Sequence, residues 1–101
     1  ALYNAYHRIH KIGYSDTEKM LTVDFTGRIC ENTDRLATER QFPKTKEGDL
    51  VAIMDTGAYG FSMSHNFNTR PRPAEIILNN GTSMLIRKRE SIKDIFQNCI
   101  T

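Results

Sequence analysis

The sequence predicts a mainly β fold, a small Greek-key-like β-barrel or sandwich that ends in a short helix. Three observations predict it: short apolar segments recur along the chain, an Asn80-Gly81 pair separates two of them, and helical spacing of apolar residues appears only near the end. Dominant strands with connections of varied length are typical of antiparallel barrels and sandwiches. The 101 residues fit one domain, and a 39% hydrophobic share is ordinary for a globular chain.

The first half of the chain contains two predicted strands and a long connection. Residues 2–12 mix aromatic, histidine and isoleucine residues, which predicts a strand partly buried on both faces. Residues 20–25 alternate in polarity and predict a second strand after a polar turn. Residues 31–48 are rich in charge and have no sustained period, so we expect a surface connection with one short helical turn near Leu36.

The second half contains a short strand and a hairpin. Residues 49–55 form an apolar segment bounded by charges, which is typical of a central strand covered on both faces. Asn80-Gly81 predicts a tight turn between strands at residues 74–78 and 83–88, because both turn residues tolerate positive φ.

The end of the chain predicts a short helix. Ser91 is a favourable residue to cap its first turn. Apolar residues then follow at helical spacing, namely Ile92, Ile95, Phe96 and Cys99.

Composition argues against several classes of protein. The 14 basic and 12 acidic residues give a net charge of +2, so no one-sided basic field for nucleic acid is evident, and we interpret Arg87-Lys88-Arg89 as a solvated face. No apolar stretch approaches the ~20 residues of a membrane span. The two cysteines, Cys30 and Cys99, do not make a disulfide framework. Reduced thiols in the cytoplasm are therefore expected.

The segment from Gly57 to Pro73, GAYGFSMSHNFNTRPRP, predicts a loop that presents binding residues. It is too irregular for a helix face or a strand, and too aromatic for a flexible linker. Tyr59 lies between Gly57 and Gly60, where the backbone can approach a ligand and the phenol can form a hydrogen bond. A tyrosine that packs under the loop is the alternative, and spacing alone does not separate the two.

Cys30 and Glu31 form a second candidate for chemistry. A thiol with an unperturbed pKa near ~8.5 is mostly protonated at neutral pH, so it can act as an acid or a nucleophile. A neighbouring carboxylate can bind an ammonium group. Spacing alone favours a buried cysteine beside a solvated glutamate. His7 and His10 fall on opposite faces of a strand, and no Cys or His pair completes a zinc pattern, so we expect no metal site.

Three segments, ALYNAYH at the start, CENTD from Cys30 and the run from Gly57 to Glu75, together resemble the diaminopimelate decarboxylase family, whose members are pyridoxal-phosphate enzymes of the alanine racemase-like fold type. The run GAYGFSMSHNFNTRPRPAE resembles the C-terminal signature of that family. ALYNAYH at the start resembles its ALYxAYH strand, and CENTD from Cys30 resembles its CESGD motif. The segments stand in the order of the family, and the hairpin and the ending IRKRESIKDIF also fit, so the resemblance covers the whole chain.

The resemblance implies that residues 1–101 are the C-terminal β-domain of a two-domain enzyme. An N-terminal (β/α)8 barrel, absent from this chain, would carry the lysine that binds pyridoxal phosphate covalently. The active sites would be shared across a homodimer. Cys30 would be the acid that protonates the substrate carbon after carbon dioxide leaves, and Glu31 would contact the distal end of the substrate. Tyr59 would reach cofactor and substrate near the phosphate, and Tyr3 would help to hold a substrate carboxylate.

The activity implied by the resemblance is the conversion of meso-diaminopimelate to L-lysine and carbon dioxide, and the chain alone is expected to be inactive. The sequence departs from the family pattern at Asn32-Thr33, which replaces Ser-Gly, and at His65 and Phe67, which replace the commoner Ser and Tyr. A decarboxylase for a related diamino acid, such as carboxynorspermidine, is therefore one alternative. A non-catalytic binding module with the same fold and, less favoured, a nucleic-acid-binding barrel are the others.

Overall fold

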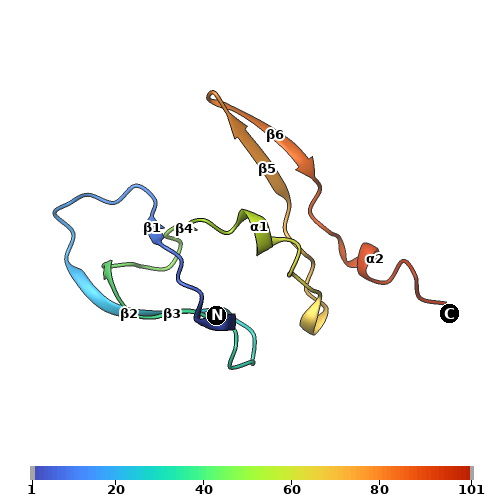
Figure 1. Cartoon of the computed structure of the whole chain (residues 1–101), viewed down its shortest axis with the longest axis horizontal. Helices are drawn as coiled ribbons and strands as arrows, with labels where there is room; N and C mark the ends of the chain where they lie inside the picture. The colour runs from blue at the N-terminus through green and yellow to red at the C-terminus, as the bar shows by residue number, and fades with distance from the viewer. Residues whose placement is uncertain (1, 101) are drawn as a thin grey trace. The chain divides into compact units, whose positions relative to one another are not determined.

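The computed structural model describes residues 2–100 and consists mainly of short antiparallel strands joined by loops (Figure 1). The chain divides into two compact units, Ala1–Thr56 and Gly57–Thr101. Within the described residues the strands form three two-stranded sheets, two in unit 1 and one in unit 2. The mainly β class is therefore confirmed. Closure into a barrel or sandwich is not seen in residues 2–100 and stays a prediction.

The larger sheet of unit 1 pairs β2 (Met20–Thr26) with β3 (Arg35–Pro43). The side chains of β2 alternate between exposed and half-buried, as expected for a strand with one covered face. Phe25 and Phe42 meet edge to face across the sheet, with ring centroids 4.8 Å apart. The second strand, expected at residues 20–25, is confirmed. The buried residues of the described chain are Ala37, Phe42 and Pro43.

β3 corrects the prediction of a surface connection with a helical turn near Leu36. Charged residues interrupt the apolar pattern of this strand, and they are accommodated there because each has a specific partner. Glu39 adopts a φ of 50°, and its N–H donates to the Asp24 carboxylate at 2.8 Å, where the register of the sheet shifts. Arg40 donates to the carbonyl of His7 at 3.1 Å, and its guanidinium carbon lies 3.8 Å from the centroid of the Tyr6 ring.

The smaller sheet of unit 1 pairs β1 (Ile9–Lys11) with β4 (Val51–Ile53). The strand expected at residues 2–12 is thus much shorter, because Leu2–Asn4 forms a 3-10 turn instead. The strand expected at residues 49–55 is found as β4, but the prediction that it is a central, doubly covered strand is wrong. β4 has one described partner strand, and Val51 is exposed.

Lys11 ties the polar turns of unit 1 together. Its ammonium nitrogen lies 2.8 Å from a carboxylate oxygen of Glu18 and 3.2 Å from one of Asp49, and it donates to the carbonyl of Lys44 at 2.9 Å. The hydrogen bond to Glu18 is the main cause of a raised pKa at Lys11. The N–H of Lys46 holds the pKa of Asp49 below its usual value. The cluster therefore joins the loop that precedes β2 to the loop that precedes β4.

Unit 2 contains the predicted hairpin, β5 (Glu75–Asn79) and β6 (Thr82–Arg87), which is confirmed (Figure 1). Asn80 and Gly81 have φ values of 47° and 76°. Positive φ at both central residues is the geometry of a type I′ turn, whose twist matches that of the flanking strands.

The predicted C-terminal helix is confirmed as α2 (Ile92–Ile95), although it is shorter than the apolar spacing to Cys99 suggests. The Ser91 hydroxyl accepts from the N–H of Asp94, and the Asp94 carboxylate accepts from the N–H of Ser91 at 2.7 Å. That second bond holds the pKa of Asp94 below its usual value. Across residues 2–100, no helix has the length and apolar character that crossing a membrane requires.

Candidate functional site

The turn that contains Cys30 is organised by Asp34. The Asp34 carboxylate accepts from the N–H of Ile29 at 2.8 Å, and its carbonyl accepts from the N–H of Gly27 at 2.7 Å. The N–H of Asp34 in turn donates to the carbonyl of Glu31 at 3.0 Å. A Cβ at Gly27 would lie 1.9 Å from the Asp34 carboxylate, so any larger residue here would have to displace that carboxylate. The turn is therefore fixed by contacts within eight residues of sequence.

Cys30 and Glu31 are both exposed and line the same pocket of about 250 Å³. The interpretation of Cys30 as a buried apolar residue is wrong, because the turn directs it outward instead of into a core. One oxygen of the Glu31 carboxylate accepts from the N–H of Thr33 at 3.1 Å and from its hydroxyl at 3.3 Å. A thiol and an oriented carboxylate therefore lie next to each other at the surface, where a proton donor and an ammonium-binding group can act on one ligand.

Tyr3 lies apart from that pocket. It has a φ of 61° and is 89% exposed. Positive φ is uncommon for an aromatic residue. The neighbouring Asn4 lines another pocket of about 360 Å³, and Arg35 contributes to both pockets. Unit 1 thus brings Cys30 and Glu31 together but does not bring Tyr3 into contact with them.

Tyr59 belongs to unit 2 and lies on α1 (Gly57–Gly60), a single helical turn that the sequence does not predict. Its side chain is 70% exposed, so the alternative of a tyrosine packed under the loop is wrong. Its carbonyl accepts from the N–H of Met63 at 3.1 Å, and the carbonyl of Ala58 accepts from the Ser62 hydroxyl at 3.1 Å. The backbone around Tyr59 is therefore ordered while its phenol is accessible.

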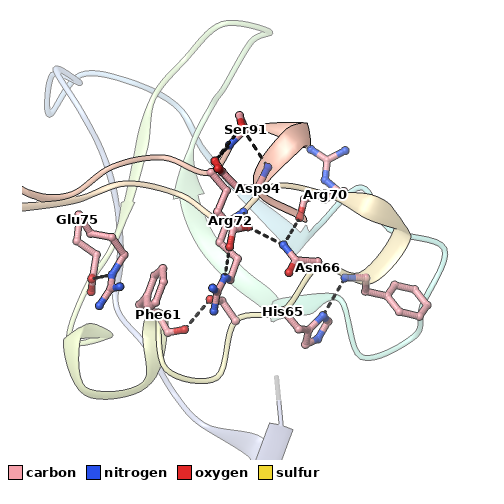
Figure 2. A network of polar contacts seen from close by, with 12 residues as sticks. Phe61, His65, Asn66, Arg70, Arg72, Glu75, Ser91 and Asp94 are labelled. Carbon is pink, nitrogen blue, oxygen red and sulfur yellow. Dashed lines mark hydrogen bonds and ion pairs between the residues drawn. The ribbon is translucent and has the colours of Figure 1, made fainter. Parts of the chain in front are cut away.

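A polar network that includes Asn66 and Arg72 fixes the rest of this loop (Figure 2). The Glu90 carboxylate accepts from the amide of Asn66 at 2.6 Å, and from the backbone N–H and the Nε of Arg72 at 2.7 and 2.8 Å. The Arg72 N–H is the main cause of a lowered pKa at Glu90. The sequence does not predict a role for Glu90. Arg72 lies 18 positions and Asn66 24 positions before it, and no spacing pattern indicates contacts over such separations.

Two of the three histidines, His7 and His10, lie beside and in β1. The Nδ1 of His7 lies 3.0 Å from the carbonyl oxygen of Met54, and His10 belongs to β1. Among residues 2–100 there is no group of three or more His, Cys, Asp or Glu side chains arranged to hold a metal ion.

Comparison with known proteins identifies the family to which the chain belongs. Residues 1–57 match the profile of the family described as pyridoxal-dependent decarboxylase, C-terminal sheet domain. The diaminopimelate decarboxylase of Methanothermobacter thermautotrophicus is 41% identical over 97 residues, which cover 96% of this chain and 23% of that protein. The diaminopimelate decarboxylase of Campylobacter jejuni is 46% identical over 94 residues, which cover 93% of this chain and 23% of that protein.

Solved structures agree. The diaminopimelate decarboxylase of M. jannaschii in complex with L-lysine matches with a TM-score of 0.90 and 35% identity, over 98% of this chain and 22% of that one. The Helicobacter pylori enzyme complexed with L-lysine matches with a TM-score of 0.85 and 35% identity, over 95% of this chain and 23% of that one. The chain thus spans about a quarter of the length of these relatives. It belongs to the family of pyridoxal-dependent decarboxylase C-terminal sheet domains.

Proposed function

We propose that residues 1–101 are the C-terminal β-domain of a diaminopimelate decarboxylase, which converts meso-diaminopimelate to L-lysine and carbon dioxide. The proposal rests chiefly on the exposed Cys30-Glu31 pair and the exposed Tyr59, found in a chain similar over nearly all its length to enzymes of that name. The relatives complexed with L-lysine support the same product.

The residues present fit a contribution to a pyridoxal phosphate site. The phenol of Tyr59 is accessible and can form a hydrogen bond to a phosphate oxygen at the end of an ordered turn. When bound, the cofactor takes up the electrons left by the departing carbon dioxide. The lysine that binds the cofactor covalently is assigned to the N-terminal barrel.

Cys30 supplies the proton that replaces the carboxyl group. The bond between the substrate carbon and its carboxylate breaks, carbon dioxide leaves, and a proton passes from the sulfur to that carbon; solvent then restores the thiol. The Glu31 carboxylate binds the distal ammonium of the substrate, and the Thr33 bonds fix its orientation. Tyr3 helps to hold a substrate carboxylate. In this proposal Cys30 and Glu31 act across the dimer interface, and each active site is completed by the barrel and by residues of the second subunit.

Exposed apolar side chains support an N-terminal barrel as partner. The hairpin of β5 and β6 exposes large apolar residues over most of its length, at 45 to 79% of their surface. Uncovered apolar patches of this kind mark contacts with other domains or subunits. We propose that the barrel and a homodimer partner cover such surfaces, and that the sheets close into a barrel or sandwich there. The residues are Ile76, Ile77, Leu78, Met84, Leu85 and Ile86.

The decisive experiment compares the two cysteines in the complete enzyme with pyridoxal phosphate. Both thiols are exposed and neither is in a disulfide, so they form a matched pair. Cys30→Ala should lower the rate of carbon dioxide release by about 10²- to 10⁴-fold, as expected for loss of a general acid. Cys99→Ala should leave it unchanged. An unchanged rate in Cys30→Ala would reject the acid role, and a wild-type enzyme without lysine formation would reject the proposed function.

A related diamino acid is the second candidate substrate, favoured by the Thr33 hydroxyl on Glu31. A value of kcat/KM that is higher for carboxynorspermidine than for diaminopimelate would identify it as the substrate.

The chain alone is expected to be inactive and to show no absorbance band of bound cofactor; a stoichiometric band would contradict this. The two exposed thiols agree with a cytoplasmic location, which we propose as well.

A further inference from the structure

Phe61 is held by two guanidinium groups. The guanidinium carbon of Arg87 lies 3.9 Å from the centroid of its ring, and that of Arg72 lies 4.7 Å away. Both distances are within the range of a cation–π attraction. The ring is half-buried, in contrast to the exposed Tyr59 two residues earlier. Within the Tyr59 loop (residues 57–73), Phe61 therefore has two cationic partners among the described residues.

Each guanidinium is itself fixed by a carboxylate. Arg87 pairs with Glu75 on the facing strand of the hairpin, and Arg72 pairs with Glu90 at 2.8 Å. Figure 2 shows Phe61 between Glu75 and Arg72. The partners come from β5, from β6 and from the segments beside them, so the ring is anchored to the base of the hairpin. Arg87 thus has structural partners although its side chain stays 52% exposed, in agreement with the interpretation of Arg87-Lys88-Arg89 as a solvated face. We call Phe61, Arg72, Glu75, Arg87 and Glu90 the Phe61 clamp.

The clamp connects to Tyr59 through the backbone. The carbonyl of Phe61 accepts from the N–H of Ser64 at 2.9 Å, and the carbonyl of Tyr59 accepts from the N–H of Met63 at 3.1 Å. These bonds make residues 59–64 one short ordered segment. The exposed phenol has little packing of its own, so its position depends on the segment to which it is attached.

We propose that the Phe61 clamp is a positioning device for Tyr59, and that Phe61 is a positioning residue for the cofactor and substrate site. The inference rests on the proposed function of Tyr59. Loss of the ring frees residues 57–64 from the hairpin, and the phenol then samples orientations that do not bind. Because Phe61 does not touch the reacting atoms, its loss weakens binding more than it slows the chemical step.

The test compares two phenylalanines of the same loop in the complete enzyme. Phe61→Leu should raise the dissociation constant of pyridoxal phosphate and the KM of diaminopimelate about five- to tenfold, the order expected for two lost cation–π contacts, with kcat changed less than about twofold. Phe61→Tyr keeps the ring and should restore both values. Phe67→Leu is the matched control, because the ring of Phe67 meets His65 and belongs to no clamp contact.

A second measurement is independent of activity. Hydrogen exchange of the backbone at residues 57–64 should quicken in Phe61→Leu and stay unchanged in Phe67→Leu, and Arg87→Gln should give an intermediate effect. Equal exchange and equal cofactor affinity in the two leucine variants would overturn the inference, as would faster exchange spread uniformly over unit 2. If the wild type forms no lysine, the proposed function fails while exchange still tests the clamp. If the wild type forms lysine and Tyr59→Phe weakens cofactor binding, as loss of the proposed phenol hydrogen bond requires, while Phe61→Leu has no effect, only the clamp fails.

Discussion

The Cys30 turn (residues 27–34) and the Tyr59 loop (residues 57–73) present their candidate groups by different means. In the turn, the bonds of Asp34 to Gly27, Ile29 and Glu31 all lie within eight residues of sequence. In the loop, Glu90 reaches Arg72 and Asn66 across 18 and 24 residues. The first arrangement is encoded locally and needs no other element, whereas the second depends on the hairpin being folded. The two regions should therefore respond differently to substitution.

The largest expected effect is that of Gly27→Ala. The new Cβ would meet the Asp34 carboxylate and displace it from the N–H of Ile29. A hydrogen bond to a charged group contributes roughly 1.5–3 kcal/mol, so the free energy of unfolding should fall by about that order. Thermal unfolding of the complete enzyme measures the loss. Decarboxylation should fall with it, because Cys30 and Glu31 belong to the same turn.

Gly57→Ala is the matched glycine in the other region. A Cβ at Gly57 meets no atom within 4 Å, so the melting temperature should stay close to that of the wild type. A comparable loss of stability in both variants would contradict the claim that the clash with Asp34 is what makes Gly27→Ala destabilising.

Glu90→Ala should loosen the Tyr59 loop and leave the Cys30 turn intact. The substitution removes the acceptor for the Asn66 amide and for two donors of Arg72. Hydrogen exchange at residues 61–72 should quicken by about tenfold, the scale of a local opening, with no change at residues 27–34. Glu47→Ala, a change at an exposed glutamate of unit 1, is the control. Faster exchange in both regions would show that they are not independently stabilised.

Acid should weaken the loop through Glu90. The Arg72 N–H stabilises the ionised carboxylate, so the pKa of Glu90 lies below its usual value in the folded protein. Its contribution is complete above the ordinary glutamate pKa of about 4.3 and is lost as the pH falls through the lower folded value. The difference in melting temperature between wild type and Glu90→Gln should thus be largest near neutrality and shrink below about pH 4. A difference independent of pH would show that the charge of Glu90 has no role.

The same contrast explains how much the sequence predicts. The hairpin turn at Asn80-Gly81 and the capping box of Ser91 and Asp94 are local, and both the turn and the helix cap were predictable from residue type and spacing. The contacts of Glu39 and Arg40 in β3 were not predictable. Their charge indicates solvent-exposed positions, yet in the folded chain Glu39 contacts Asp24 and Arg40 contacts Tyr6. A charged residue in a strand is recognisable once its distant partner is known.

The candidate site divides in the same way. The family resemblance identifies Cys30, Glu31 and Tyr59, but spacing alone favoured a buried Cys30, because it does not reveal the bonds by which Asp34 turns the chain outward. An aspartate four residues after a cysteine in a turn is a signal that was available. No comparable sequence signal indicates the contact of Phe61 with Arg87, since the two residues are 26 positions apart with loop and hairpin between them.

The smallest expected effect, and the finest test of the local region, is that of Thr33→Val. Valine keeps the shape of threonine and the backbone N–H bond to Glu31 but removes the hydroxyl that lies 3.3 Å from the same carboxylate oxygen. Because that bond is long and exposed, the KM for diaminopimelate should rise only about two- to threefold, with kcat and melting temperature unchanged. Thr33→Ser should restore the wild-type KM. A lower KM in Thr33→Val would contradict this prediction. It would show that the hydroxyl competes with the substrate for the Glu31 carboxylate instead of orienting that carboxylate for binding.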